Sequence, residues 1–262
     1  MAGHSWYAPR LNPVSNSIPE LSIVLPCYNE EGNIPGLLKA FRALVGRADF
    51  ELILVDNGST DDTPAAMRTA LAMTENSFAR SVRVDKNIGY GHGLQTGLEA
   101  ARAATVAFSH ADLQCPPEDV LRAFELYHRE RNRGPRLIMG RRSGRPLADR
   151  VVTWCYNHLA ASKLELRAES LEGGRVRSPD INAQPKIFDR GLVKTLAKGP
   201  KDFTYDLFVL HSCVRAGIKI LEFDVPYLAR GWGKSKLAAN PWVRLKTAVD
   251  AARRIASLRR LV

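Results

Sequence analysis

Short apolar runs alternate with longer segments of helical periodicity along the first half of the chain. The runs at residues 21–25, 52–55, 81–84 and 105–108 are each followed by apolar residues that recur every three or four positions. This alternation is typical of parallel βαβ units, because consecutive parallel strands need a crossover connection, which is usually a helix. We therefore predict an α/β fold with a mostly parallel, Rossmann-like sheet flanked by helices.

The pattern gives approximate bounds for the remaining elements. The first four helices are expected at residues 33–45, from about 62, after Gly93 and after Pro117. Further along, we expect a strand at 137–139, an irregular amphipathic helix at 148–166, a loop at 172–179, an apolar pair at 187–188, helices at 189–198 and 203–216, a strand at 218–223 and a loop at 229–236.

Composition excludes several classes of protein. A chain of 262 residues can bury a full hydrophobic core without disulfide bonds or a structural metal. Its four cysteines are scattered without a CxxC pair, so we expect no disulfide framework or structural zinc site, and a reducing compartment. We also expect no secretory signal and no spanning helix, since no apolar stretch reaches about 18 residues.

The formal net charge of +11 comes from two patches. Residues 129–150 carry eight arginines against two acidic residues, and residues 230–262 carry nine basic residues against Asp250 alone. Such local charge indicates an anionic partner at particular places, such as nucleic acid, a phosphorylated ligand or acidic lipid. Nucleic acid is disfavoured, because the first patch lacks stacking aromatic residues and any recognised binding module.

The chain divides into three parts on this pattern. We expect a flexible arm at residues 1–20, one α/β domain at 21–236 and a basic amphipathic helix at 237–262. Apolar residues in the last segment recur at 242, 245, 249, 252, 255 and 258, with Lys and Arg on the opposite face. This helix either lies on an anionic membrane surface or docks on the domain with a solvated basic face.

Polar side chains follow the first two predicted strands. Pro26 is expected to end the first strand, Tyr28 offers a flat face for a base, and Glu30 offers an acceptor for ribose or base donors. The alternative, which taken alone is favoured, is a helix entry with acidic residues at the favourable end of the dipole. After the second strand, Asp56 can reach the imino edge of a nucleobase. A turn and helix cap account for residues 59–62 but not for Asp56.

Two more segments follow the third and fourth strands. The glycine-rich residues 87–93 fit no phosphate-binding fingerprint, and indicate either a turn that admits a ligand or close helix packing. In the extended conformation expected for residues 110–114, His110, Asp112 and Gln114 point to one side. Oxygen ligands of this kind suit Mg²⁺ or Mn²⁺ bridged to a diphosphate. The alternative is an ordinary strand end with Gln114 capping the next helix.

Together these motifs resemble family 2 glycosyltransferases of the GT-A fold. The segments Pro-x-Tyr-Asn-Glu, Val-Asp-x-Gly-Ser-Thr-Asp and Ala-Asp-Leu-Gln-x-Pro-Pro-Glu occur in this order, and Gly-Arg-Arg and Arg-x-x-Gly-x-Ser-Lys follow them. Within the family, the chain is most similar to dolichol-phosphate mannosyltransferase and bacterial polyprenyl-phosphate glycosyltransferases. The resemblance covers about residues 20–236.

The resemblance implies three groups of site residues, of which Asp112 and Arg142 are the expected catalytic pair. The donor nucleotide sugar is expected to bind Pro26, Tyr28, Glu30 and Asp56; the metal and diphosphate, His110, Asp112 and Gln114; and the acceptor phosphate, Arg142, Arg230, Ser235 and Lys236. Lys186 either joins the acceptor phosphate pocket or is an ordinary solvent-facing lysine. Asp180 and Gln184 could line the sugar site.

Two residues depart from the family pattern. Asn57 stands where the family usually has the second of two aspartates, and His110 stands where it has the first aspartate of Asp-x-Asp. Losing a carboxylate weakens Mg²⁺ binding, whereas a neutral imidazole still binds Mn²⁺. We therefore predict a divalent cofactor with Mn²⁺ preferred over Mg²⁺. The alternative is that the site has lost metal-dependent transfer.

The expected reaction is single displacement with inversion, from a nucleotide sugar to a polyprenyl or dolichyl phosphate. GDP-mannose and UDP-sugars both remain open as donors. A phosphate monoester has a second pKa of about 6, so it arrives anionic and needs cationic positioning instead of a general base. Arginine can bind it through two parallel hydrogen bonds.

Two other functions fit the same residues. The first is transfer to a saccharide or protein hydroxyl, which requires a base such as Asp206, otherwise a helix residue with no distinctive partner. The second is a non-catalytic sugar-nucleotide-binding protein, suggested by His110 and Asn57. A lipid acceptor implies a peripheral location on the cytoplasmic face of a membrane, with the terminal helix or a separate membrane-anchoring subunit holding the enzyme there.

Overall fold

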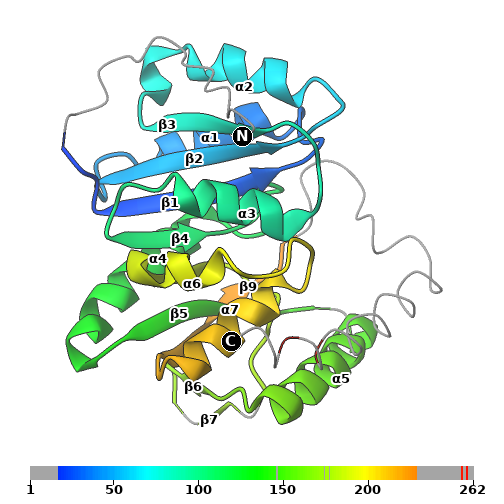
Figure 1. The fold of residues 1–262 in the computed structure, drawn as a ribbon. Coiled ribbons are helices and arrows are strands. Elements are labelled where there is room, and N and C mark those ends of the chain that lie inside the picture. Colours follow the sequence, from blue (N-terminus) through cyan, green and yellow to red (C-terminus); the bar gives the residue numbers. More distant parts are fainter. Residues whose placement is uncertain are drawn as a thin grey trace.

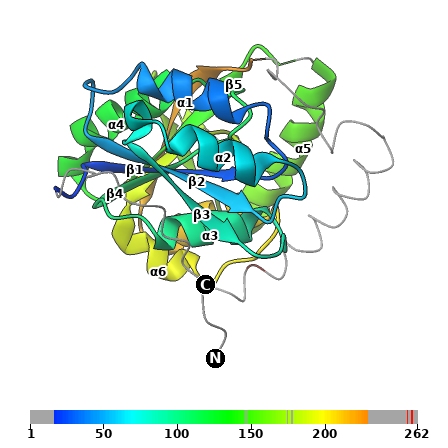
Figure 2. The same cartoon turned by 90° about the horizontal axis from the view of Figure 1, so that it is seen from above.

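The computed structural model describes residues 17–145, 147–173, 175–176 and 178–228, together with Ile255 and Leu258. Over these residues the chain forms a mixed sheet in the strand order β3-β2-β1-β4-β8-β5-β9-β6-β7 (Figure 1). Helices cover both faces of the sheet (Figure 2). The predicted α/β class with a mostly parallel sheet is confirmed.

The strands are β1 (Leu21–Cys27), β2 (Phe50–Asn57), β3 (Ala79–Val84), β4 (Thr105–Phe108), β5 (Arg136–Ser143), β6 (Ala168–Ser170), β7 (Arg175–Val176), β8 (Lys186–Asp189) and β9 (Lys219–Pro226). The α-helices are α1 (Ile34–Arg42), α2 (Thr63–Leu71), α3 (Tyr90–Glu99), α4 (Pro117–Glu130), α5 (Leu147–Leu164), α6 (Val193–Leu196) and α7 (Tyr205–Arg215). Prolines lie in the first turns of α1, α2 and α4, where an N–H has no helical partner.

Strand direction decides which loops share an edge. β1 pairs in parallel with β2 and β4, β2 with β3, and β9 with β5 and β6. β8 lies between β4 and β5 and is antiparallel to both. The carboxyl ends of β1, β2, β4, β5 and β9 therefore share one edge with the amino end of β8. Ligands of such sheets bind outside the carboxyl ends of the strands.

The hydrophobic core has two layers, one on each face of the sheet. Along β2, Ile53 and Val55 face the layer formed with α3, α6 and α7, whereas Leu52 and Leu54 face the layer formed with α1 and α4. This alternation follows from the two-residue period of a strand. Both faces are covered, which is why the strands read as continuous apolar runs instead of alternating ones.

Several predicted bounds are wrong in informative ways. Pro26 does not end the first strand, because β1 continues to Cys27 and Pro26 pairs with Val55. The helix expected after Gly93 already begins at Tyr90, so the glycine-rich segment forms its first turn. The loop expected at 172–179 contains β7, and the helix expected at 189–198 is a 3₁₀ turn followed by α6.

Most of the predicted arm and terminal helix lies outside the described residues, which start at Ser17. Of the terminal segment only Ile255 and Leu258 are described; both are helical, and only 2% and 1% of their surfaces are exposed. They belong to the core layer formed with α3 and α7. At these two positions the apolar residues pack on the domain, which is the docked alternative and not the membrane-facing one.

Candidate active site at the carboxyl edge of the sheet

The loops after β1 and β2 are joined by polar side chains. Asn29 has a positive φ of 58° and its backbone N–H donates to the Ser59 hydroxyl at 3.1 Å. Its amide oxygen accepts from the Thr60 N–H at 2.9 Å, and its amide nitrogen donates to Thr60 Oγ1 at 3.2 Å. The backbone N–H of Glu30 donates to Thr63 Oγ1 at 2.8 Å. The sequence analysis gave Asn29 no role. Its left-handed backbone conformation is one that asparagine adopts more often than most residues.

Asp56 combines one satisfied and one open carboxylate oxygen. Its Oδ1 accepts the Ser59 N–H at 2.9 Å, which closes the turn after β2. Its Oδ2 is buried and has no hydrogen-bond partner among the described residues, although Arg83 Nη1 lies 3.7 Å away. A buried acceptor without a donor is costly unless a ligand fills it. This geometry fits the predicted contact with a base N–H.

The neighbouring Asn57 has a different task. Its Nδ2 donates to the Gly89 carbonyl at 3.0 Å, a bond that an ionised aspartate could not make. A Cβ on Gly93 would lie 2.8 Å from Asn57 Cγ, so the glycine makes room for this side chain. The substitution of Asn for the usual Asp is therefore explained by packing between β2 and α3.

The glycine-rich segment packs closely against a neighbouring loop. The His92 N–H donates to the Lys201 carbonyl at 3.0 Å. A Cβ on Gly91 would lie 2.4 Å from the Pro200 carbonyl oxygen. The predicted close helix packing is therefore present, since the first turn of α3 packs directly against the loop before α7.

The other predicted donor residues lie at the same edge. Pro26 is the penultimate residue of β1. Tyr28 and Glu30 are partly buried in the loop that follows, where Glu30 Oε2 accepts a short hydrogen bond from Asn33 Nδ2. Cys27 pairs with Asp56, so the loop that carries Tyr28 and Glu30 starts next to the end of β2.

Residues 110–114 form a turn, so the predicted extended conformation is wrong. Leu113 has a φ of 59°, and the Gln114 N–H donates to Asp112 Oδ1 at 3.2 Å. The Gln114 amide nitrogen donates to the Leu228 carbonyl at 3.1 Å. The three side chains therefore do not share a side through strand alternation. The Asp112 side chain closes an Asx-turn, and the geometry of this turn sets the direction of the three side chains.

His110 and Asp112 interact electrostatically in this turn. Burial lowers the pKa of His110, and the charge of Asp112 opposes that shift. A neutral imidazole is the form that binds a metal. Among the described residues no group of three His, Cys, Asp or Glu side chains could hold a metal ion. The residues therefore fit a divalent cation only if other oxygens, such as those of a diphosphate, complete its shell.

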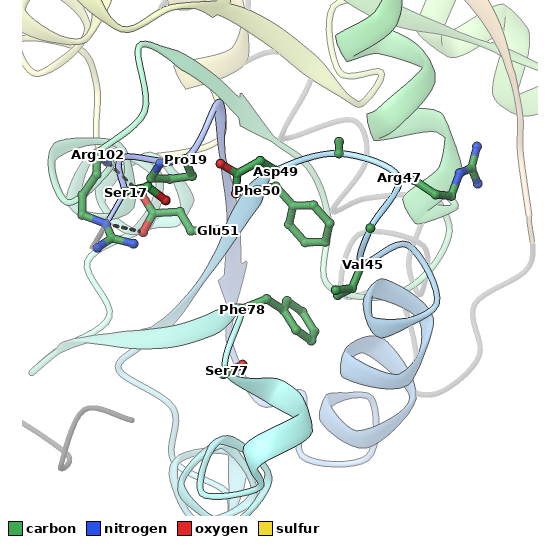
Figure 3. A pocket seen from close by; sticks show the side chains of 12 residues that line it. Ser17, Pro19, Val45, Arg47, Asp49, Phe50, Glu51, Ser77, Phe78 and Arg102 are labelled. Atoms are coloured by element: carbon green, nitrogen blue, oxygen red, sulfur yellow. Dashed lines mark hydrogen bonds and ion pairs between the residues drawn. The ribbon is translucent and has the colours of Figure 1, made fainter. Parts of the chain in front are cut away.

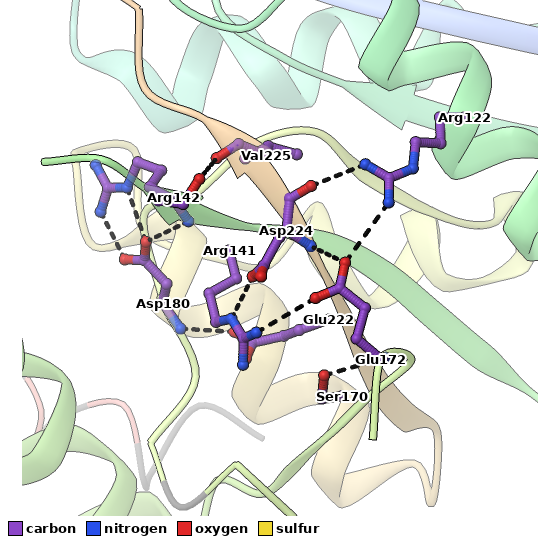
Figure 4. A network of polar contacts seen from close by, with 10 residues as sticks. Arg122, Arg141, Arg142, Ser170, Glu172, Asp180, Glu222, Asp224 and Val225 are labelled. Carbon is purple, nitrogen blue, oxygen red and sulfur yellow. Dashed lines mark hydrogen bonds and ion pairs between the residues drawn. The ribbon is translucent and has the colours of Figure 1, made fainter. Parts of the chain in front are cut away.

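Arg142 lies at the end of β5 and is paired with Asp180. Its Nε and Nη2 donate to the two Asp180 carboxylate oxygens at 2.8 and 2.6 Å, and its backbone N–H donates to Oδ2 at 3.2 Å (Figure 4). Its side chain is 19% exposed. The fork geometry holds the guanidinium in one orientation at the edge of the site.

Lys186 does not lie at the surface, so the prediction of an ordinary solvent-facing lysine is wrong, whereas its place in an acceptor phosphate pocket stays a prediction. It is the first residue of β8 and is fully buried. Its Nζ donates to Asp206 Oδ1 at 2.6 Å and to the Ala183 carbonyl at 2.8 Å. Burial lowers its pKa, and the attraction of Asp206 opposes this. Antiparallel pairing with Phe108 and Met139 brings it inside.

Asp206, predicted to have no distinctive partner, is instead the centre of a buried cluster. Besides Lys186, it accepts a hydrogen bond from Gln184 Nε2 at 2.9 Å. The same amide contacts the Tyr90 hydroxyl at 3.4 Å, and burial raises the pKa of Tyr90. The Tyr90 ring stacks on Phe203 with centroids 5.6 Å apart. In this part of the edge, Arg142 and Lys186 are therefore each paired with a carboxylate.

The remaining predicted acceptor residues, Arg230, Ser235 and Lys236, lie outside the described part of the chain. For the residues that are described, no helix is long and apolar enough to cross a membrane.

A cavity of about 490 Å³ lies at the opposite edge of the sheet, at the amino ends of the strands (Figure 3). One of its acidic residues, Glu51, accepts hydrogen bonds from Ser22 Oγ at 2.6 Å and the Arg102 N–H at 2.9 Å. Glu51 also pairs with the guanidinium groups of Arg80 and Arg102 at 3.0 Å. These charges are paired with one another. The network therefore connects the amino ends of β1, β2 and β3 with the residues before β4.

Two curated relatives align with most of the chain. An undecaprenyl-phosphate 4-deoxy-4-formamido-L-arabinose transferase of Aeromonas hydrophila is 27% identical over 229 residues, which cover 85% of this chain and 64% of the relative. The chain thus spans less than two thirds of that relative's length. An uncharacterised glycosyltransferase of Mycobacterium bovis is 29% identical over 221 residues, covering 84% of this chain and 90% of the relative.

Solved structures support the fold. Glucosyl-3-phosphoglycerate synthase from Mycobacterium tuberculosis, in complex with Mn²⁺, UDP-glucose and phosphoglyceric acid, superposes with a TM-score of 0.63 at 22% identity. The match covers 92% of this chain and 78% of that one. The model of the family described as "Glycosyl transferase family 2" matches residues 22–165, which include β1 to β5 and the Asp56 and Asp112 loops. The chain therefore belongs to glycosyl transferase family 2.

Proposed function

We propose that this protein is an inverting glycosyltransferase that moves a sugar from a nucleotide-sugar donor to a polyprenyl or dolichyl phosphate. The observation that carries the proposal is the pairing at the acceptor edge. The carboxylate that a hydroxyl acceptor would need as a base, Asp206, is held by a fully buried Lys186 at 2.6 Å. A phosphate acceptor needs no such base and instead needs a positioned cation, which Arg142 offers.

The donor half of the proposal rests on the β1 and β2 loops. Asp56 Oδ2 is a buried acceptor that makes no hydrogen bond among the described residues and has only the more distant Arg83 guanidinium, at 3.7 Å, as a partner, which suits a base N–H. In this proposal Tyr28 and Glu30, in the loop that follows β1, contact the base and the ribose. The identity of the nucleotide and sugar stays open between GDP-mannose and UDP-sugars, and the Aeromonas relative acts on a formamido-arabinose.

The metal proposal rests on His110 and Asp112. A divalent cation held there would neutralise the charge that develops on the diphosphate leaving group. The Mycobacterium tuberculosis synthase was crystallised with Mn²⁺ and UDP, which supports a divalent metal in this protein too. We keep the preference for Mn²⁺ over Mg²⁺, because a neutral imidazole is a better ligand for Mn²⁺ than for Mg²⁺.

A membrane surface is part of the proposal, since the acceptor is lipid-linked. On α5, Val151, Trp154 and Leu159 are exposed by 53%, 59% and 42% and follow helical spacing on one face. The exposed Arg150 and Lys163 lie near the ends of this stripe. An apolar stripe with tryptophan and flanking basic residues suits the interface of an anionic bilayer on the cytoplasmic side.

Vesicle binding tests the membrane part. We expect sedimentation with anionic phospholipid vesicles, weakened several-fold by Trp154→Ser. The control is Met73→Ser, which removes a comparably exposed apolar side chain elsewhere. Equal sedimentation of both variants would contradict a membrane contact through α5.

The decisive experiment is a donor panel with short-chain polyprenyl phosphate and, in parallel, the matching polyprenol and simple sugars. GDP-mannose, UDP-glucose, UDP-N-acetylglucosamine and UDP-aminoarabinose are each assayed with Mn²⁺, Mg²⁺ and chelator. The proposal expects transfer to the phosphate only, lost with chelator and faster with Mn²⁺. Transfer to a hydroxyl would favour the rival acceptor class, and donor binding without transfer would favour a non-catalytic binder.

A further inference from the structure

A second carboxylate lies beneath the acceptor edge and none of the roles above uses it. Glu222 is in the middle of β9, between the apolar residues Leu221 and Phe223, and is fully buried. Its Oε1 accepts the backbone N–H of Asp180 at 2.7 Å. Its Oε2 has no hydrogen-bond partner in the described part of the chain. Burying a carboxyl in this way is costly, so its single strong bond requires an explanation.

That bond connects Glu222 to the acceptor arginine in two steps. The Asp180 backbone is held by Glu222, and the Asp180 carboxylate holds the Arg142 guanidinium through two hydrogen bonds (Figure 4). We call this series of contacts from Glu222 through Asp180 to Arg142 the relay. Arg142 lies on β5 and Glu222 on β9, which are neighbouring parallel strands, so both ends of the relay are fixed to the same part of the sheet. The position of Arg142 therefore depends on where the Asp180 backbone lies.

The segment that carries Asp180 is held at several points, which include the bonds of Ala183 to Lys186 and of Gln184 to Asp206 described above. Residues 178–185 lie outside the strands and lead into β8. At one end, the Gly140 N–H donates to the Pro185 carbonyl at 3.0 Å, where a Cβ on Gly140 would lie 2.3 Å from the Gln184 carbonyl oxygen. At the other end, Glu222 supplies the bond from the core to the Asp180 main chain.

We propose that Glu222 is a positioning residue that sets the orientation of Arg142 through Asp180. The inference rests on the proposed function, in which Arg142 contacts the acceptor phosphate. Glu222 itself touches no substrate and acts only through the segment that it anchors. Glu222 lies one layer behind the residues that contact the acceptor and holds them in place. The residues around a metal site orient the metal ligands in the same way.

The charges around Glu222 make this support sensitive to pH. Burial raises its pKa to about 7, and the carboxylates of Asp180 and Asp224 add to the shift. The Asp180 N–H and the guanidinium of Arg141 on β5 oppose it. Ionisation turns the bond to Asp180 into a charge-assisted one, which is shorter and stronger than the neutral bond.

Two variants separate the acceptor role from simple packing. Glu222→Gln keeps an oxygen that can accept the Asp180 N–H but removes the charge. Glu222→Leu fills similar space without any acceptor. The control is Glu51→Gln and Glu51→Leu, which change another buried glutamate, on β2, at the opposite edge of the sheet.

Nuclear magnetic resonance tests the relay without any turnover. In the wild type we expect the Asp180 amide proton to titrate with a midpoint near pH 7 and move downfield as Glu222 ionises. We expect no such titration in Glu222→Gln, and a displaced Arg142 Nε–Hε signal in Glu222→Leu. An Asp180 amide that is flat with pH in the wild type, or an Arg142 signal unchanged in Glu222→Leu, would overturn the proposal.

Kinetics with polyprenyl phosphate and the donor found active complete the test. We expect Glu222→Leu to raise KM for the acceptor at least tenfold, with KM for the donor within twofold of wild type, and Glu222→Gln to restore the acceptor KM. Both Glu51 variants should leave the acceptor KM unchanged. An equal effect of Glu222→Leu on both KM values would overturn the positioning role. If no polyprenyl phosphate reacts, the proposed function fails, while the resonance measurements still decide the relay.

Discussion

The proposed donor half and acceptor half of the carboxyl edge differ in how their charged side chains are paired. On the donor half, after β1 and β2, the loops are joined mostly through bonds to backbone N–H groups, and Asp56 keeps a buried oxygen that makes no hydrogen bond among the described residues and has only Arg83, at 3.7 Å, as an ionic partner. On the acceptor half, at β5, β8 and β9, each buried cation has its own carboxylate, as in Arg142–Asp180 and Lys186–Asp206. The donor half is thus prepared to receive hydrogen bonds, whereas the acceptor half holds cations already oriented.

This difference follows from what each half is expected to bind. A nucleobase is neutral and makes hydrogen bonds in fixed directions. A carboxylate oxygen that is available to accept a hydrogen bond can therefore select it without an opposite charge on the base. A phosphate is anionic and accepts hydrogen bonds from many directions. The arginine that binds it must therefore be held in place before the ligand arrives. Breaking a pair on the acceptor side should therefore cost mainly stability and orientation, whereas removing an oxygen on the donor side should cost mainly ligand affinity.

The largest effect is expected from Lys186→Met. Removing one partner of a buried pair leaves Asp206 uncompensated and should lower the free energy of unfolding by about 3–5 kcal/mol. Urea unfolding measures this, with Lys186→Met/Asp206→Leu expected to recover most of the loss. The matched control is Lys219→Met, whose pair with Glu169 is exposed and is worth at most about 1 kcal/mol. Equal losses in the two single variants would contradict a buried pair.

A somewhat smaller effect is expected from the pH dependence of Glu222→Gln. Glu222 holds its proton more tightly when folded, since its pKa rises from 4.5 to about 7. The stability that this proton contributes is full below about pH 4.5, is lost as the pH rises to about 7, and stays lost above that. Relative to the wild type, Glu222→Gln should therefore gain roughly 3 kcal/mol between pH 4.5 and pH 8. Parallel stability curves in urea would contradict this.

The smallest effect is expected from Asp56→Asn on the donor half. The variant keeps an oxygen for the Ser59 N–H but replaces the open acceptor by a donor. Donor affinity measured by calorimetry with UDP and GDP should fall about 10- to 100-fold, the loss expected for a mismatched hydrogen bond to a charged group. The acceptor KM and the melting temperature should stay close to wild type. A loss of acceptor binding instead would contradict the division into two halves.

Local sequence patterns predicted the part of the fold that local physics controls. The strand at 105–108 matches β4 at both ends, and the apolar periodicity located α1 and α4 to within a few residues. These elements are determined by side-chain periodicity over one segment. The Asp56 site was also predictable, because a strand tip followed by glycine places a carboxylate in the same way in any parallel sheet.

The site features that the sequence did not predict depend on pairing between distant segments. Nothing near Lys186 indicates that β8 inserts between β4 and β5 in the reverse direction, because a four-residue strand carries too little pattern to select its neighbours. The turn at residues 110–114 replaced the expected extended segment for a related reason. The Gln114 amide donates to the carbonyl of Leu228, which is far away in the sequence.

The sequence by itself therefore determined the α/β class, the family and the loops to which we assign the donor. Only the tertiary structure decided which charges meet. Asp180, Asp206 and Glu222 each lie at least 20 residues from the cation or amide they bind, apart from short contacts within their own segments. A local pattern reports which side chains a segment can bury, but the partner of a buried charge is chosen by the order and direction of the strands.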